Sequence, residues 1–213
     1  MEFESLLAVA GRMMCFDLAL VVQMFGGDRA STRVQLSRWM KAGKVIALRR
    51  GLYSLADGYR KTRIVPEVLA AELHRPSYLS GLWAMARYGL IPEKVAWFTC
   101  VTSRSPARYE NVAGIFVFQH VSIERFFGYQ QNEMDGQLFF LASPEKALLD
   151  HWYLTEGEWT AARLREMRYQ NLDTVHADRL RQDAEKMLSP RVMRAAKRFL
   201  KLIESPGELG EEL

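Results

Sequence analysis

Basic side chains gather in one short stretch of the chain, where no acids balance them. Residues 29–55 contain seven Lys and Arg and no Asp or Glu. Guanidinium groups donate paired hydrogen bonds to phosphate oxygens and to the major-groove edge of guanine. The stretch therefore has two interpretations, contact with a polyanion or a solvated basic face. The seven residues are Arg29, Arg33, Arg38, Lys41, Lys44, Arg49 and Arg50.

The excess positive charge of the chain belongs to its first 60 residues. The formal net charge is +4, from 29 Lys/Arg and 25 Asp/Glu. Residues 1–60 contain nine of these bases and five of the acids, so the rest of the chain has 20 of each and is neutral. Such asymmetry between segments is typical of proteins that bind nucleic acids.

The elements around the basic stretch are predicted from apolar spacing and from residues that end helices. A helix is expected at 3–10 and another at 16–25, apolar on nearly every side and hence buried, with Asp17 in its first turn. A third helix, capped by Ser31 or Thr32, is expected to end before Gly43. Its inward stripe is Leu36, Trp39 and Met40.

Two short strands follow the third helix and enclose a tight turn at 49–51. The order helix, helix, turn, helix, hairpin predicts a winged helix-turn-helix, in which the third helix enters the major groove. Arg33 and Arg38 are then expected at base edges, Ser37 and Lys41 at phosphates, and the hairpin arginines at the backbone or minor groove. The predicted DNA-binding residues are Thr32, Arg33, Ser37, Arg38, Lys41, Lys44, Arg49 and Arg50.

The rest of the chain predicts a mixed α/β domain with a helical C-terminal part, so that the fold class is α+β and the domains are 1–60 and 61–213. Ser143 and Pro144 are a strong helix start, and the segment 143–150 is interpreted as capping and packing only. The helix at 189–202 contains five bases and no acids, and the tail 204–213 is acidic and expected to fray. Further expectations are a connector at 57–65, helices at 66–74 and 76–88, strands at 97–103 and 114–121, and a hairpin of 126–130 with 137–141 around the loop NEMDG.

Three strings together resemble a known family. GKVIALRRGLYSL, PSYLSGLWAMARYGLIPE and LASPEKALLD, in this order, resemble the AbiEi-type antitoxins of bacterial type IV toxin–antitoxin systems, up to about residue 155. The resemblance implies a repressor of its own operon and a C-terminal domain that counters a nucleotidyltransferase-like toxin without holding it tightly. It also places Arg33, Ser37, Arg38 and Lys41 on the recognition helix, and the two hairpin arginines on the wing.

The sequence contains no recognisable catalytic or metal-binding motif, so neither an enzyme nor a cofactor is predicted. A nucleotidyltransferase needs a Gly-Ser turn followed by paired metal-binding carboxylates, whereas Ser80-Gly81 is in the reversed order. Asp150 and His151 are adjacent on a helix and so point about 100° apart. The two cysteines, Cys15 and Cys100, and the four histidines have no metal-ligand spacing.

The expected partner is double-stranded DNA, an operator with an inverted repeat on which two copies could dimerise. No apolar run reaches the length of a membrane helix, and the acidic start is unlike a secretory signal, so a cytoplasmic protein is predicted. An alternative is a DNA-binding regulator that senses a ligand. In that case aromatic residues would line a pocket, although core packing explains them as well: Trp83, Tyr88, Trp97, Phe116 and Phe118.

Overall fold

The described part of the chain begins with three helices and a small antiparallel sheet of strand order β1-β3-β2. The computed structural model describes residues 2–204, so the predicted frayed tail lies, except for Glu204, outside the described residues. The hairpin expected after the third helix is confirmed as β2 and β3. The elements are α1 (Phe3–Ala10), β1 (Phe16–Asp17), α2 (Leu18–Phe25), α3 (Arg29–Lys41), β2 (Val45–Arg49) and β3 (Leu52–Leu55).

Helix α3 starts earlier than its sequence suggested. Asp28 is the N-cap, and its carboxylate accepts the backbone N–H groups of Ala30 and Ser31 at 2.7 and 2.9 Å. The predicted cap at Ser31 or Thr32 is therefore wrong, because an Asp three residues earlier already satisfies the first free N–H groups. The predicted end is confirmed, since Gly43 follows the helix with a φ of +67°.

The segment predicted as one helix over 16–25 contains a short strand and then a helix. Phe16 and Asp17 pair with β3, and Asp17 caps α2 by accepting the N–H of Leu20 at 2.7 Å. The expectation of a helix buried on every side is wrong. Only Leu18 and Val21 are buried, whereas Met24 is 39% exposed.

A mixed six-stranded sheet of order β6-β7-β5-β4-β9-β8 forms the middle of the described chain. β4 runs parallel to β9 and β5 runs parallel to β7, while the remaining pairs are antiparallel. Helix α4 (Pro66–Leu73) precedes the sheet after the irregular connector 56–65, in which the predicted boundary at residue 60 lies. The strands are β4 (Ser77–Leu79), β5 (Phe98–Thr102), β6 (Ala107–Asn111), β7 (Gly114–His120), β8 (Tyr129–Met134) and β9 (Gln137–Ala142).

Two parts of this sheet differ from the prediction. Residues 77–79, expected at the start of a helix, form β4, and the helix α5 begins only at Gly81. The loop expected at 132–136 is mostly strand, because β8 continues to Met134. Asp135 and Gly136, with φ values of 52° and 72°, then make a two-residue hairpin turn.

The last third of the described chain is helical, as predicted. Helix α6 starts as expected, with Ser143 accepting the N–H of Lys146 at 3.2 Å and Pro144 in the first position. The remaining elements are α5 (Gly81–Arg87), η1 (Ile123–Arg125), α6 (Pro144–Leu154), α7 (Ala161–Glu166), η2 (Leu172–Thr174), α8 (Ala177–Lys186) and α9 (Pro190–Glu204). With helices and mixed sheet in one chain, the fold class is α+β.

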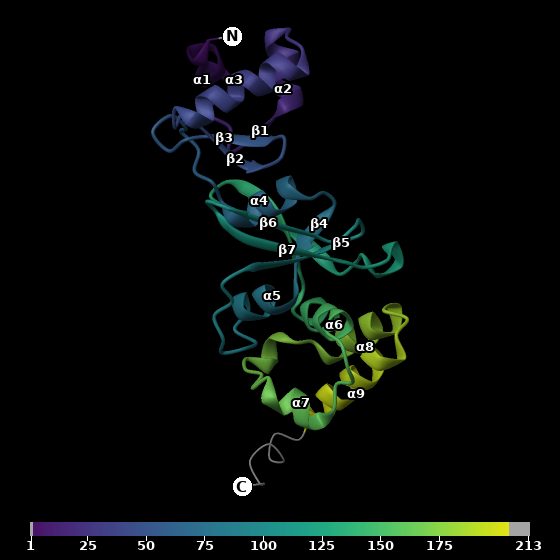
Figure 1. Ribbon diagram of the computed structural model, residues 1–213. Helices are drawn as coiled ribbons and strands as arrows, with labels where there is room; N and C mark the ends of the chain where they lie inside the picture. Colours follow the sequence, from purple (N-terminus) through teal and green to yellow (C-terminus); the bar gives the residue numbers. More distant parts are fainter. Residues whose placement is uncertain (1, 205–213) are drawn as a thin grey trace.

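The N-terminal elements and the C-terminal helices lie at opposite ends of the molecule, and α5 lies beyond the larger sheet, beside α6 (Figure 1). The helices α1–α3 and the small sheet occupy one end, the larger sheet the middle, and α6–α9 the other end. Buried apolar residues form two clusters, a small one within residues 3–55 and a large one across the rest. Leu48 and Leu52 of the hairpin belong to the large cluster, so the hairpin packs against both parts.

Candidate nucleic-acid interface

A groove of about 560 Å³ lies between α3 and the β2–β3 hairpin, and we call it the basic groove. It contains four arginines and no carboxylate. The apolar side chains in its walls come from α2, α3 and the hairpin. Its lining residues are Leu18, Arg29, Arg33, Met40, Ala47, Arg49, Arg50, Gly51 and Tyr53.

The basic side chains of residues 29–50 have no acidic partners. Within residues 2–204, none of the seven forms an ion pair with a carboxylate. The nearest acid in sequence is Asp28, whose carboxylate is used in the helix cap. Its hydrogen bond from the Ser31 N–H lowers the pKa of this carboxyl. The positive charge of the groove is therefore left for solvent or an external anion.

The outward side of α3 presents most of the residues that the sequence placed there. Arg33, Arg38 and Lys41 are exposed, and Ser37 is half-buried. The inward stripe is also as predicted, with Leu36 and Trp39 buried and Met40 packed against the small cluster.

Thr32 is placed differently from the other predicted residues. Its side chain is buried at 5% exposure, and its hydroxyl donates to the Asp28 carbonyl at 2.8 Å. The structure therefore gives Thr32 a place in the first turn of α3 and leaves its side chain little surface for a ligand.

Arg49 is half-buried and bound within the molecule. Its Nε donates to the carbonyl of Leu73 at 2.8 Å, and a terminal nitrogen reaches the Glu72 carbonyl at 3.3 Å. Both carbonyls are at the C-terminal end of α4, where a cation complements the helix dipole. The sequence placed Arg49 at the tip of the hairpin, but its guanidinium joins the hairpin to α4.

The free tip of the hairpin is Arg50-Gly51. Arg50 is exposed, and Gly51 has a φ of +81° that allows the tight turn. Lys44, just after α3, is half-buried and lies over the ring of Phe3, with its Nζ 4.5 Å from the ring centroid. Arg29, which was not among the predicted contacts, is exposed and lines the groove. The one sequence signal for Arg29 was its position in residues 29–55, which contain seven bases and no acid.

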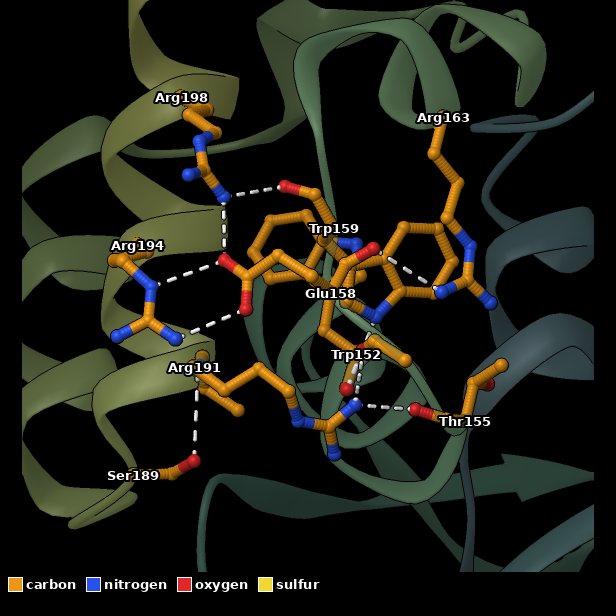
Figure 2. A network of polar contacts seen from close by, with 11 residues as sticks. Trp152, Thr155, Glu158, Trp159, Arg163, Ser189, Arg191, Arg194 and Arg198 are labelled. Carbon is orange, nitrogen blue, oxygen red and sulfur yellow. Dashed lines mark hydrogen bonds and ion pairs between the residues drawn. The ribbon is translucent and has the colours of Figure 1, made fainter.

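Several arginines of the second basic helix predicted from the sequence are bound within the molecule (Figure 2). Arg194 and Arg198 of α9 both bind the carboxylate of Glu158, at 2.9 and 2.6 Å. Arg191 donates to backbone carbonyls, among them Tyr153 at 2.6 Å and Gly157 at 2.8 Å. Three of the five bases therefore attach α9 to the loop after α6, which distinguishes this helix from α3.

The segment 143–150, interpreted from sequence as capping and packing, also contains a buried ion pair. Lys146 and Asp150, four residues apart on α6, pair with both side chains at 0% exposure. Asp150 also accepts hydrogen bonds from Tyr78 at 3.0 Å and Ser80 at 2.7 Å. Sequence reasoning missed this pair, although the spacing of four residues on one helix was a visible signal.

His151 has no catalytic arrangement with Asp150. Its Nδ1 lies 3.4 Å from the Thr155 hydroxyl, and its buried Nε2 has no hydrogen-bond partner among the described residues. Burial, and then the charge of Arg163, lower the pKa of the imidazole to about 4. The carboxylate of Asp150 is bound instead to Lys146, Tyr78 and Ser80.

Neither a cluster of metal-ligating side chains nor a helix fit to span a membrane occurs within residues 2–204. No group of three or more His, Cys, Asp and Glu side chains in this range is arranged to hold a metal ion. The helices of this range also lack the combination of length and apolar character that a bilayer-crossing segment requires. Cys100 is buried, Cys15 is half-buried, and both are free thiols.

Comparison with models of known protein families gave no match, and no curated protein matched the sequence either.

Proposed function

We propose that this protein is a DNA-binding transcriptional repressor and the antitoxin of a type IV toxin–antitoxin system. It would act in the cytoplasm, have no catalytic activity of its own, and control its own operon through residues 1–60 as a winged helix-turn-helix. The observation that carries the DNA-binding part is the basic groove, whose four arginines face no carboxylate. Phosphate neutralisation accounts for the affinity of such a surface.

In the proposed complex α3 enters the major groove of the operator. Arg33 and Arg38, both exposed, read base edges, because a guanidinium matches the two acceptors of guanine. Lys41 and Arg29 bind phosphates on either side. Arg50, at the exposed hairpin tip, reaches the backbone or the minor groove beside it. Thr32 and Arg49 hold α3 and the hairpin in position through their hydrogen bonds to Asp28 and Leu73.

A single module of this kind makes a small interface with DNA, about 600–1,000 Å². Two copies on an inverted repeat supply a specificity that one copy lacks, because a second half-site adds its own base contacts. We therefore propose that two chains bind one operator and dimerise there.

The antitoxin part of the proposal is supported by the resemblance to AbiEi-type antitoxins alone. That resemblance depends on the order of the three strings at 43–55, 76–93 and 141–150. By analogy, residues 61–213 counter a nucleotidyltransferase-like toxin, and no stable complex with that toxin is expected.

The test of DNA binding is a salt titration with the duplex just upstream of the gene and with a scrambled duplex. We expect wild type to prefer the upstream duplex and Arg33→Ala to lose this preference. Arg50→Ala should weaken binding to both duplexes and reduce the slope of log K against log salt by about one. Arg165→Ala is the matched control, because Arg165 is exposed on α7, far along the chain. Equal, weak binding to both duplexes would reject the repressor.

A ligand-sensing regulator is the second candidate function, and one observation favours it. A groove of about 830 Å³ lies where the N-terminal elements meet α4 and β6, and its volume is typical of a small-molecule site. The aromatic residues first considered for such a pocket are elsewhere: Phe116 and Phe118 are 0% and 1% exposed in the large cluster.

A further inference from the structure

The groove between the N-terminal elements and α4, which we call the junction groove, joins three parts of the chain. Residues of β1 and α2 form one wall, the end of α4 another, and Arg104 with Tyr109 of β6 the third. Arg49 lies in this groove and in the basic groove. Arg49 is therefore shared by the two grooves.

Positive charge in the junction groove exceeds what its own acids neutralise. The lining includes three arginines and two carboxylates, Asp17 and Glu72. Glu72 pairs with Arg75, and Asp17 is used as the cap of α2. Neither Arg49 nor Arg104 has a carboxylate partner in the described chain.

Arg104 is the arginine best placed for an external anion. Its side chain is exposed, and its one hydrogen bond in the described residues runs from a terminal nitrogen to the Arg75 carbonyl at 3.2 Å. Most of its donors therefore remain available. The neighbouring His74 responds to the same positive field. Burial lowers the pKa of this imidazole, and the charges of Arg104 and Arg49 lower it further.

Part of the remaining lining is apolar. The half-buried side chains of Met13 and Leu20 contribute apolar surface to the walls, and the half-buried Tyr109 of β6 adds an aromatic ring. A bare inorganic anion would leave this apolar surface unused. A ligand with an apolar body would bury it and gain free energy in proportion to the area covered.

We propose that the junction groove binds a small organic anion, with its acid group at Arg104 and its apolar body against Leu20 and Tyr109. Because Arg49 also lines the basic groove, an occupant changes the affinity for DNA. Only this coupling depends on the proposed DNA binding, whereas the binding of the anion does not.

Isothermal titration of the full chain with octanoate, 2-naphthoate and the neutral analogue 1-octanol tests the site. We expect both anions to bind and 1-octanol to bind at least about ten-fold more weakly, because charge-assisted hydrogen bonds are lost. Arg104→Ala should weaken both anions by about 10- to 100-fold, and Arg165→Ala should not change them. Failure of both anions to bind, or equal binding by Arg104→Ala, would overturn the site.

The coupling is tested by measuring the affinity for the upstream duplex with and without octanoate. We expect octanoate to shift the affinity of wild type and not that of Arg104→Ala. Octanoate binding without any DNA binding would reject the proposed repressor and leave the groove in place. Octanoate binding with an unshifted DNA affinity would overturn the coupling. A reduced salt slope of DNA binding in Arg104→Ala would assign the groove to nucleic acid and overturn the anion site.

Discussion

The ion pair between Lys146 and Asp150 is unusual because both charged side chains are fully buried. The carboxylate is well supplied with donors from Lys146, Tyr78 and Ser80. Burial nevertheless raises the pKa of the Asp150 carboxyl, and the charge of Lys146 opposes this shift. A buried pair of this kind contributes little net stability while it is intact, but it is costly to break.

Removal of one partner should therefore be far more harmful than removal of both. Asp150→Ala leaves a buried ammonium without its counter-ion, and we expect the free energy of unfolding to fall by about 3–5 kcal/mol. The double substitution Lys146→Met with Asp150→Leu should recover most of this loss. Urea unfolding of the three proteins measures the difference. A single substitution that costs no more than an average surface change would mean that Lys146 finds another partner or water.

At the scale of the elements, Glu158 binds two arginines of α9 and so helps to attach this helix to the loop after α6. Hydrogen bonds from Arg194 and Arg198 lower the pKa of its carboxyl from 4.5 to about 2. A carboxyl whose pKa is lower in the folded state stabilises the protein above its unfolded pKa, and this contribution is lost as the pH falls through the folded value.

Glu158→Gln should thus lower the thermal unfolding midpoint at pH 7, and the difference from wild type should shrink as the pH falls from about 4.5 to about 2. Thermal unfolding followed by circular dichroism across this range measures the effect. Glu166→Gln, exposed on α7, is the control. A difference that does not change with pH would mean that the arginines hold α9 without this carboxylate.

Local signals made some elements predictable from sequence. The start of α6 and the end of α3 depend on residues within one turn, Ser143 and Gly43, so their positions could be predicted. β4 could not, because residues 77–79 are a strand only through pairing with β5 and with β9, about sixty residues away.

In the candidate site, too, some residues could be placed from local sequence and others depend on distant parts of the chain. The exposure of Arg33 and Arg38 follows from the helical spacing of the buried residues around them. The role of Arg49 depends on where α4 lies, which no pattern near residue 49 contains. Likewise, the ion pairs of Arg194 and Arg198 depend on Glu158, which lies in another part of the sequence.

At the scale of the whole molecule, two side chains join the hairpin to the middle of the protein: Arg49, and Asn111 of β6, whose amide donates to the Leu48 carbonyl at 3.0 Å. The bonds of Arg49 to the α4 carbonyls hold the hairpin against the six-stranded part. The connector 56–65 passes between the same two parts. Loss of the guanidinium should therefore loosen the connection without unfolding either cluster.

We expect Arg49→Ala to raise the rate of hydrogen exchange in residues 56–65 severalfold and to weaken DNA binding. Arg50→Ala is the matched control, because it removes the neighbouring charge at the exposed tip and should weaken DNA binding without changing exchange. Hydrogen exchange read by mass spectrometry distinguishes the two. Unchanged exchange in Arg49→Ala would show that the packing of Leu48 and Leu52 and the Asn111 hydrogen bond hold the hairpin without Arg49.

The parallel pairing of β4 with β9 also has a consequence for the order in which the chain acquires its shape during synthesis. β4 leaves the ribosome early, but its partner β9 ends at residue 142, so the six-stranded sheet stays incomplete until two thirds of the chain has emerged. The small cluster needs only residues 3–55, and chains commonly fold from the N-terminal part first. The arginine-rich end would then be formed while the part that positions it is still being translated.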